Sequence, residues 1–329
     1  MQLAGGHLFA AALYTVAKLD VAELLADGPK SVAELAKQTA SNEDALYRVM
    51  RFLVGAGIFE LVSPRVFALT EDAQSLRSKS PHSVRDMVLW MGNPFHFHVW
   101  GEMSHSVKTG LPAVEKVYGK PAFELFDVLP DVAAEFNAAM SRLSRDLIPN
   151  VLDAYDFSGI NVLMDVAGGH GVVLCEMLQR YPKMKGILFE IPKLIDDAKC
   201  NVCSLKMDHR CDVVAGNFFE AIPGWADAYY MQHIIHDWND EKVLKILQNV
   251  REALTGKKNG KFIVVDCVLP ENGSPHFGNL LDIEMLLMPG GRERTESEFR
   301  DLFAKGGFEI TKIVPTKGAE SVIEAVLVE

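Results

Sequence analysis

The sequence has few cysteines, no long apolar run and no excess of positive charge. Its 329 residues include only five cysteines, an odd and sparse set, which argues against a disulfide-stapled secreted scaffold and favours a reduced, cytoplasmic protein. No apolar run reaches the roughly 18 residues that a membrane-spanning helix needs. The formal net charge of −11 disfavours nucleic acid and anionic membranes as partners, because both attract basic surfaces.

Two local patterns resemble a zinc site and a signal peptide, but each lacks a required feature. Cys200 and Cys203 form a CxxC pair, but the spacing to His209 and Cys211 fits no common zinc module, so no metal site is predicted. The role of these cysteines is left open. The first 20 residues have an apolar centre without a basic beginning, and we interpret them as a core helix and not as a signal peptide.

Helical periodicity dominates residues 1–155, and an apolar content of 49% is enough for a large core. Ser31, with Glu34 three residues later, predicts a capped helix start. Residues 42–57 predict a second amphipathic helix, and two short β-like runs follow in residues 58–70. Helix, turn, helix and hairpin are the pattern of a winged helix. We therefore predict a helical, winged-helix-like N-terminal domain over residues 1–155.

A winged helix raises the alternative of a DNA-binding regulator that senses a small ligand. The second predicted helix carries Glu43 and Asp44 against Arg48 and Arg51, so its charges cancel. A helix that reads a DNA groove needs a net basic face. We therefore favour a structural or dimerising role for this domain.

Strands and helices alternate over residues 156–329, which predicts a doubly wound, Rossmann-like α/β domain with a mostly parallel sheet. The last two strands are expected to form an antiparallel hairpin at one edge. The strands are predicted at 162–167, 185–190, 211–216, 226–232, 261–267, 308–314 and 321–329.

A glycine-rich loop follows the first of these strands, in the segment "DVAGGHG" (Asp165–Gly171). Glu190 ends the second strand, where a carboxylate can bind the two hydroxyls of a ribose. The dinucleotide fingerprint GxGxxG is incomplete, because Leu174 stands where its third glycine would be. The pattern favours S-adenosylmethionine, whose tail is an amino acid, over a nicotinamide cofactor.

The segment "QHIIHDWND" (Gln232–Asp240) places His236 at the carboxyl end of the fourth strand, where ligands bind in such sheets. A neutral imidazole there can take a proton from a hydroxyl. Asp266 and Glu293 are candidates to hold the second ring nitrogen. The alternative is a packed histidine beside a helix cap formed by Asp237 or Asn239. For His233 we favour a core or supporting role.

The motifs "DVAGGHG", "FEIP", "GNFFEAIPGWADAYYMQHIIHDWNDE" and "GGRERTESEF" occur in the order and spacing of a known family. Over nearly its whole length the chain resembles the S-adenosylmethionine-dependent O-methyltransferases of small molecules, which include plant phenolic, acetylserotonin and bacterial natural-product enzymes. The resemblance implies a dimerisation domain at residues 1–155 and a catalytic domain at 156–329. It also implies that His236 is the general base, flanked by Glu293 and Asp266.

The resemblance further implies two sets of binding residues. Those expected at the cofactor are Gly168, Gly169, Glu190, Asn217, Phe218 and Gln232. Those expected at an aromatic acceptor are Met140 and Met285, with Phe136 and Trp100 on weaker grounds.

The sequence therefore predicts a cytoplasmic, homodimeric, metal-independent O-methyltransferase that acts on a hydroxyl of a small aromatic acceptor. The same pocket could host C- or N-methylation, or a cofactor-assisted reaction without methyl transfer. A metal-dependent branch would use a carboxylate cluster instead of a histidine base. The identity of the acceptor and the methylated atom are left open.

Overall fold

The computed structural model describes residues 3–328, and the chain divides into two compact units. One contains the residues up to Gly101 together with Leu125–Leu143, and the other contains Glu102–Glu124 together with the residues from Ser144 onward. Residues 102–124, which the sequence assigns to the N-terminal half, are thus grouped with the C-terminal unit. The predicted domain boundary at residue 155 stays a prediction.

The N-terminal unit begins with helices that pack around a small three-stranded sheet of order β1-β3-β2. Ser31 and Glu34 form the predicted capping box at the start of α3, and Asn42 caps α4. The predicted hairpin is confirmed as β2 and β3. The elements of the N-terminal unit up to Gly101 are η1 (Leu3–Gly5), α1 (Gly6–Lys18), α2 (Val21–Leu24), β1 (Lys30–Ser31), α3 (Val32–Gln38), α4 (Glu43–Gly55), β2 (Phe59–Ser63), β3 (Val66–Leu69), α5 (Glu71–Gln74), α6 (Arg85–Gly92) and α7 (Pro94–Gly101).

The predicted core helix near the N-terminus is α1, which buries Val16 and Ala17. Its unit has its own apolar core, in which Leu35, Met50 and Phe67 are fully buried. The helix-turn-helix and hairpin have the order expected of a winged helix, and that classification stays a prediction.

Four further helices follow: α8 (Met103–Thr109), α9 (Ala113–Tyr118), α10 (Ala122–Leu125) and α11 (Pro130–Ala154). The longest of these is α11, with 25 residues. Pro149 lies inside it.

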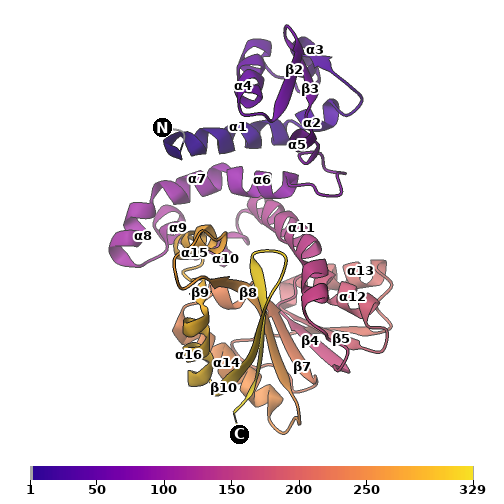
Figure 1. Cartoon of the computed structure of the whole chain (residues 1–329), viewed down its shortest axis with the longest axis vertical. Coiled ribbons are helices and arrows are strands. Elements are labelled where there is room, and N and C mark those ends of the chain that lie inside the picture. Colours follow the sequence, from indigo (N-terminus) through magenta and orange to yellow (C-terminus); the bar gives the residue numbers. More distant parts are fainter. Residues whose placement is uncertain (1–2, 329) are drawn as a thin grey trace. The chain divides into compact units, whose positions relative to one another are not determined.

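The C-terminal unit is built on an eight-stranded sheet in which β10-β11-β8-β7-β4-β5-β6 are neighbours and β9 pairs with β8. Five neighbouring strands of this sheet are parallel: β6, β5, β4, β7 and β8. β11 pairs with β8, and β10 and β11 form the predicted antiparallel hairpin (Figure 1). The strands are β4 (Val162–Val166), β5 (Lys185–Glu190), β6 (Cys211–Ala215), β7 (Ala228–Gln232), β8 (Lys261–Leu269), β9 (Arg294–Thr295), β10 (Phe308–Pro315) and β11 (Glu320–Leu327). The chain adds β5 and β6 on one side of β4 and then β7 and β8 on the other side, so the strand order reverses between β4 and β7, where ligands bind in such folds.

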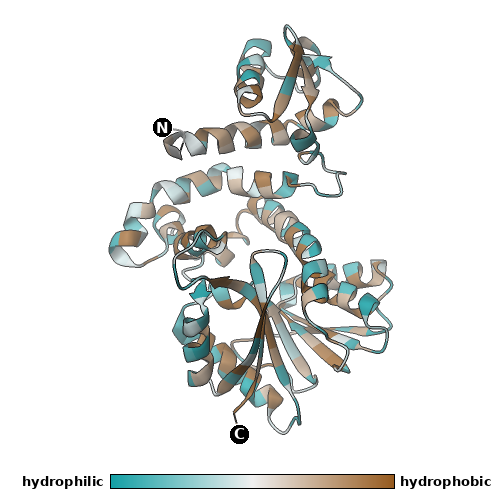
Figure 2. Cartoon of the chain, viewed as in Figure 1, coloured by the Kyte–Doolittle hydropathy of each residue, from teal (hydrophilic) through white to brown (hydrophobic). Residues whose placement is uncertain are grey.

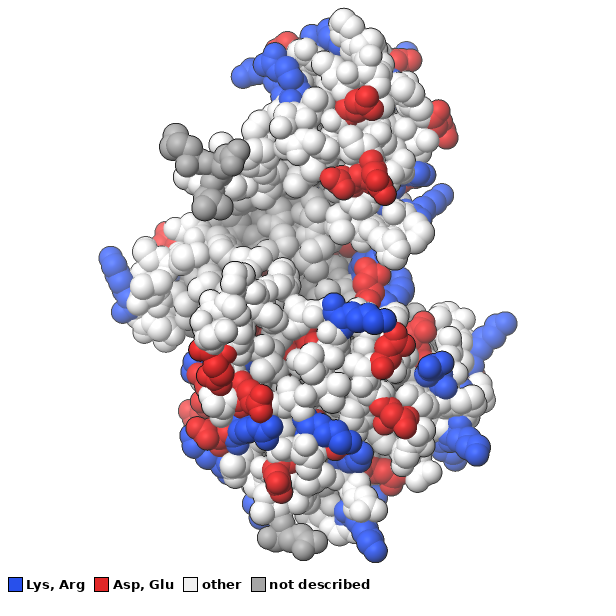
Figure 3. Space-filling view, viewed as in Figure 1, with Lys and Arg blue, Asp and Glu red and all other residues white. Residues whose placement is uncertain are grey.

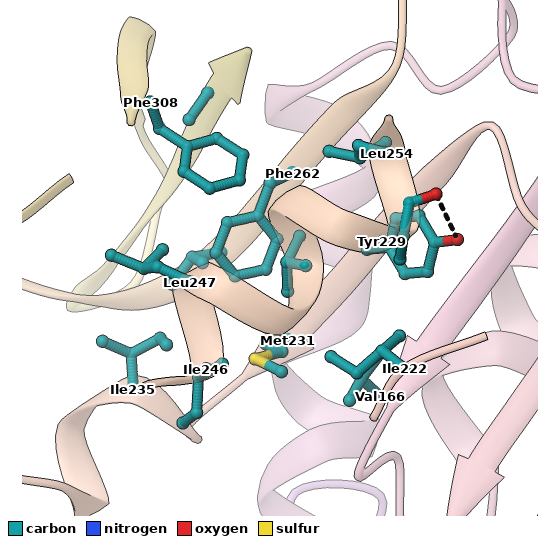
Figure 4. Close-up of a cluster of buried hydrophobic side chains, with 14 of the residues drawn as sticks. Val166, Ile222, Tyr229, Met231, Ile235, Ile246, Leu247, Leu254, Phe262 and Phe308 are labelled. Atoms are coloured by element: carbon teal, nitrogen blue, oxygen red, sulfur yellow. Dashed lines mark hydrogen bonds between the residues drawn. The ribbon is translucent and has the colours of Figure 1, made fainter. Parts of the chain in front are cut away.

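Successive side chains of a strand point to opposite faces of this sheet, and an apolar core lies on each face. Tyr229 and Met231 pack with α14 and α16 on one face, whereas Tyr230 packs with α11, α12 and α13 on the other. Figure 4 shows Phe262 beside Phe308 and Leu247 in the first of these cores. Figure 2 shows the strands as predominantly hydrophobic, as expected for a sheet covered on both faces. The helices are α12 (Val172–Arg180), η2 (Pro192–Leu194), α13 (Ile195–Ser204), η3 (Ile235–Asp237), α14 (Asp240–Leu254), α15 (Gly278–Leu287) and α16 (Glu296–Lys305).

The sequence predicts neither a membrane-spanning helix nor a nucleic-acid partner, and the helices and the surface can be compared with these two predictions. Within residues 3–328, no helix combines the length and the apolar character needed to cross a bilayer. On the face in view in Figure 3, acidic and basic side chains are interspersed and form no broad basic area. That nucleic acid is not a partner stays a prediction.

Candidate active site

The glycine loop lies between β4 and α12, and its backbone needs glycine for steric reasons. A Cβ atom at Gly168 would collide with the Asp165 carboxylate and with Leu188, and Gly171 has a φ of +74°. The Gly169 N–H donates to Glu190 Oε1 at 3.1 Å. The structure therefore brings the predicted loop and the predicted ribose-binding acid into contact at the tips of β4 and β5.

Two acidic side chains at this loop are suited to a polar ligand. Asp165 is 2% exposed, and its Oδ2 has no hydrogen-bond partner among the described residues. Burial raises the pKa of Asp165 to about 7, with a further contribution from Glu190. Burial also raises the pKa of Glu190. A tight glycine cradle beside the Glu190 carboxylate and a buried Asp165 oxygen without a partner among the described residues fits a cofactor that carries an amine and ribose hydroxyls.

The remaining predicted cofactor residues lie on the next strand ends. Asn217 accepts a hydrogen bond from the Phe219 N–H and donates to Glu220, so its side chain already supports its own turn. Phe218 packs against Phe219, with 4.6 Å between ring centroids. Gln232 ends β7 and accepts from the Tyr230 hydroxyl at 2.6 Å. Their contacts with a cofactor stay predictions.

Asn201 is a supporting residue that the sequence did not identify. Its side-chain amide in α13 donates to the His170 carbonyl oxygen at 2.7 Å and so fixes the glycine loop from the neighbouring helix. Nothing in the local sequence pattern indicates this contact, because 31 residues separate the two groups.

His236 lies in the short helix η3, directly after Ile235, which is fully buried in the core. His236 is 5% exposed, and its Nδ1 lies 2.6 Å from Glu293 Oε1. The structure therefore joins His236 to one of the two predicted acids. Asn239 caps α14 by accepting from the Lys242 N–H, so the predicted helix cap coexists with this arrangement.

The loop before β9 holds the backbone of η3 from the other side. The Arg292 N–H donates to the His236 carbonyl oxygen at 2.8 Å. Arg294 is 1% exposed, and its guanidinium donates to the carbonyl oxygens of Ile235 and Trp238 and to Asp240. Sequence reasoning missed Arg294, although it directly follows the candidate acid Glu293 and an arginine suits a position that binds several oxygen atoms.

Gly291 sets how closely this loop can approach η3. A Cβ atom at Gly291 would overlap the His236 carbonyl oxygen and the Asp237 backbone. We expect Gly291→Ala to push the two segments apart and to lower the free energy of unfolding by about 1–3 kcal/mol. Urea unfolding followed by circular dichroism measures this change. Gly55→Ala is the control, because no atom lies within 4 Å of a Cβ at that position; an equal loss in both variants would contradict the expectation.

Asp266 does not make the direct contact with His236 that the sequence allows for it. Its side chain is fully buried, and neither carboxylate oxygen has a hydrogen-bond partner among the described residues. Asp237, which the sequence treats only as a possible helix cap, lies closer: its Oδ1 is 3.6 Å from His236 Nε2. Asp266 therefore affects the imidazole through its charge and not through a hydrogen bond.

The acidic surroundings control the charge of His236. Burial by itself lowers the pKa of His236, but the carboxylates of Glu293 and Asp266 outweigh it and raise the pKa to about 10. Burial raises the pKa of Asp266 to about 7 and that of Asp237 to about 6, although the imidazole opposes both shifts. The cluster is thus a set of coupled groups that share few protons at neutral pH.

The predicted acceptor-binding residues are distributed over both units. Met285 lies in α15 of the C-terminal unit and is 8% exposed. Met140 and Phe136 lie on the part of α11 that belongs to the N-terminal unit, and Phe136 stacks on Phe126 with 4.7 Å between centroids. Trp100 is half-buried in α7. Their role at an acceptor stays a prediction.

Two hollows elsewhere on the C-terminal unit are distinct from the His236 cluster. One, of about 630 Å³, lies along β6 and α13 and is lined by Cys203, Cys211 and Trp225, among others. The other, of about 370 Å³, lies between the ends of β8, β10 and β11. In the described part of the chain, no three His, Cys, Asp or Glu side chains are grouped so that they could hold a metal ion.

The comparisons with known proteins all point to methyltransferases. Residues 100–309 match the O-methyltransferase domain, and residues 1–79 match the O-methyltransferase dimerisation domain. The chain is 35% identical over 325 residues to the phenazine O-methyltransferase PhzM of Lysobacter antibioticus, covering 99% of this chain and 94% of the relative. It is 32% identical to the 8-amino-8-demethylriboflavin N,N-dimethyltransferase of Streptomyces davaonensis, covering 95% and 90%.

A solved structure of similar fold contains both a cofactor and an acceptor. It is an O-methyltransferase from neocarzinostatin biosynthesis, NcsB1, in complex with S-adenosylmethionine and 2-hydroxy-5-methyl naphthoic acid. The TM-score is 0.84 at 27% identity, covering 97% of this chain and 96% of that one.

Proposed function

Because the chain belongs to the O-methyltransferase family and uses S-adenosylmethionine, we propose that it methylates a hydroxyl group on a small aromatic molecule, with His236 as the general base. The observation that carries the proposal is the 2.6 Å contact between His236 Nδ1 and Glu293 Oε1 at the same sheet edge as the glycine loop. The names of two similar proteins, which refer to a phenazine and to a naphthoic acid, support an aromatic acceptor.

When bound, S-adenosylmethionine supplies a methyl group on a positively charged sulfur. The remaining task for the protein is to make the acceptor oxygen electron-rich by removing its proton. Glu293 accepts from His236 Nδ1 and so leaves Nε2 as the nitrogen that can take this proton. Each methyl group transferred to a hydroxyl therefore leaves one proton on His236.

The glycine loop and Glu190 are proposed to bind the cofactor. Gly168 and Gly169 leave space for close approach of its amino-acid tail, and Glu190 offers a carboxylate to its ribose. Phe218, Asn217 and Gln232 are proposed to surround its nucleoside. Met140, Met285, Phe136 and Trp100 are proposed to contact the acceptor, since thioethers and aromatic rings pack well on an aromatic molecule.

N-methylation is the second candidate, and a specific relative favours it. The riboflavin-derivative enzyme of Streptomyces davaonensis transfers methyl groups to an amine, as its name states, and it is 32% identical to this chain over 315 residues. A neutral amine already has a free electron pair, so it needs no base before it accepts a methyl group. The two reactions thus differ in their need for His236.

Methyl transfer from isotope-labelled S-adenosylmethionine to matched panels of phenols and aryl amines tests the proposal. We expect methylated products from the phenols, identified by mass and by the position of the new ether. Labelled products from the amines alone would replace the proposal by the N-methyltransferase alternative, and no labelled product from either panel would contradict both.

A metal chelator is expected to leave the methyl transfer rate unchanged, because the proposed proton acceptor is an imidazole held by a carboxylate and not a metal-bound group. The measurement compares the rates before and after incubation with excess EDTA. The control adds Mg²⁺ to the untreated enzyme. A loss of activity that Mg²⁺ restores would contradict the proposed metal-independent mechanism.

The match of residues 1–79 to a dimerisation domain supports the predicted homodimer. The acidic net charge supports a protein that works without nucleic acid or anionic membranes. The cytoplasmic location stays a prediction.

A further inference from the structure

The two exposed cysteines of the chain lie one helical turn apart. Cys200 and Cys203 are on α13, and both are exposed free thiols, whereas the other three cysteines are buried. Burial raises the pKa of Cys175 to about 11, that of Cys211 to about 12, and that of Cys267 as well. Because the thiolate is the reactive form of cysteine, these three react poorly near neutral pH. An oxidant in solution therefore acts on Cys200 and Cys203.

The residues between these two cysteines hold the glycine loop. The Asn201 amide donates to the His170 carbonyl oxygen at 2.7 Å. Val202 is 2% exposed, and its Cγ2 would lie 3.3 Å from a Cβ atom at Gly171, so it packs closely against the loop. The thiol pair thus encloses the two side chains by which α13 positions the loop between β4 and α12.

A disulfide between Cys200 and Cys203 is within reach but does not fit an undistorted helix. Residues three apart in a helix have Cα atoms about 5 Å apart, which is inside the range of disulfides. Their Cβ atoms are about 5–6 Å apart, whereas a disulfide holds them at about 3.5–4.5 Å, so closing the bond distorts the turn by about 1–2 Å. The helix ends at Ser204, and a helix end opens more easily than a helix centre.

We propose that Cys200 and Cys203 form a reversible disulfide that loosens the glycine loop and so weakens the binding of S-adenosylmethionine. The inference rests on the proposed role of this loop at the cofactor. The disulfide distorts the turn that carries Asn201, and a hydrogen bond of 2.7 Å is weakened or lost when its atoms move apart by about 1 Å. An exposed and strained disulfide is also readily reduced again, as a reversible switch requires.

The oxidant is a small disulfide such as oxidised glutathione. Cys203 lines the hollow of about 630 Å³ along β6 and α13, so its sulfur borders a space that such a molecule can enter. The Cys203 thiolate attacks one sulfur of the oxidant and releases one glutathione, and the Cys200 thiolate then attacks the Cys203 sulfur and releases the second. Two electrons pass from the cysteines to the oxidant, and the two thiol protons end on the two glutathione molecules.

Oxidised glutathione added to the purified full chain tests the disulfide. We expect the protein to lose two of its five free thiols, and peptide mapping to find Cys200 joined to Cys203. The Kd for S-adenosylmethionine, measured by calorimetry, should rise about 2–10-fold, as for the loss of one hydrogen bond. Excess dithiothreitol should restore the Kd. A bond between Cys203 and Cys211, which line the same hollow, or a glutathione adduct alone would overturn the proposal.

Two variants separate the disulfide from other effects of the oxidant. Cys200→Ser keeps the other four cysteines and can still form a glutathione adduct on Cys203, but its Kd should not respond to the oxidant. Asn201→Ala in the reduced protein should reproduce the rise in Kd, because it removes the same hydrogen bond. An equal response of Cys200→Ser and the parent protein to the oxidant would overturn the switch.

Hydrogen exchange of the loop amides gives a readout that needs no cofactor. The amides of residues 168–171 should exchange faster in the oxidised protein and in reduced Asn201→Ala than in the reduced parent protein. A disulfide that leaves both the exchange and the Kd unchanged would overturn the switch. Faster exchange with an unchanged Kd would instead contradict the proposed role of the loop at the cofactor, and with it the effect on binding.

Discussion

Replacing His236 by alanine is expected to lower kcat for methylation of a phenol by about 10²–10⁴-fold. The imidazole is the group at the sheet edge that is held by a buried carboxylate and has a second nitrogen left to take a proton. Without it, the acceptor hydroxyl keeps its proton and its oxygen stays a weak nucleophile. The measurement is kcat and KM with a phenol identified in the panel, at saturating S-adenosylmethionine.

Two controls accompany this variant. His209→Ala removes an exposed histidine and should leave kcat unchanged. Binding of S-adenosylmethionine to His236→Ala, measured by calorimetry, should stay near that of the parent enzyme and so show that the site is folded. Full phenol methylation by His236→Ala would rule out the base role. Loss of phenol methylation with amine methylation retained would instead favour the N-methyltransferase alternative.

Replacing Glu293 by glutamine is expected to move the acidic limb of the pH–rate profile towards lower pH by about one unit or more. The base must be neutral, so activity is lost as the pH falls through the pKa of His236. In the parent enzyme the Glu293 and Asp266 carboxylates hold this pKa well above its ordinary value, at about 10, against the opposite effect of burial. Removing one carboxylate lowers the pKa, and the neutral imidazole then persists to lower pH.

The same substitution is expected to reduce the maximal rate by on the order of 10²-fold or more, because an amide no longer enforces the productive imidazole tautomer. The measurement is kcat/KM for the phenol from pH 6 to pH 11 for both enzymes, so that the range extends above the pKa of about 10 in the parent. Glu309→Gln is the matched control, since Glu309 is exposed. An acidic limb that stays in place, or moves to higher pH, would show that Glu293 does not control the charge of His236.

The elements of the sheet were predictable because each depends on a local pattern. β4, β5, β7 and β8 were recognised as apolar runs, and each is buried on both faces. The contact between the glycine loop and Glu190 was also predictable, because parallel strands end at a common edge. The pairing of β10 with β11 followed from a short polar turn between two β-like runs.

The partner of His236 was only partly predictable. The sequence indicated both Glu293 and Asp266 as candidates. Asp266 lies near the end of a predicted strand, and Glu293 lies in a loop expected at the same edge of the sheet. The structure has Glu293 in contact with the ring and Asp266 without a hydrogen bond among the described residues. Which of the two carboxylates reaches the ring depends on how distant segments pack, which spacing along the chain does not report.

The sequence by itself determined the alternation of elements, the glycine loop, and the position of an imidazole at a strand end, because these follow from local periodicity and from steric needs of the backbone. Only the tertiary structure decided how Gly291 and Arg294 hold the turn that carries His236. Only it brought Glu320, 87 residues after His233, to the second histidine. Contacts between distant segments depend on packing distances of a few ångströms, and a linear sequence does not contain them.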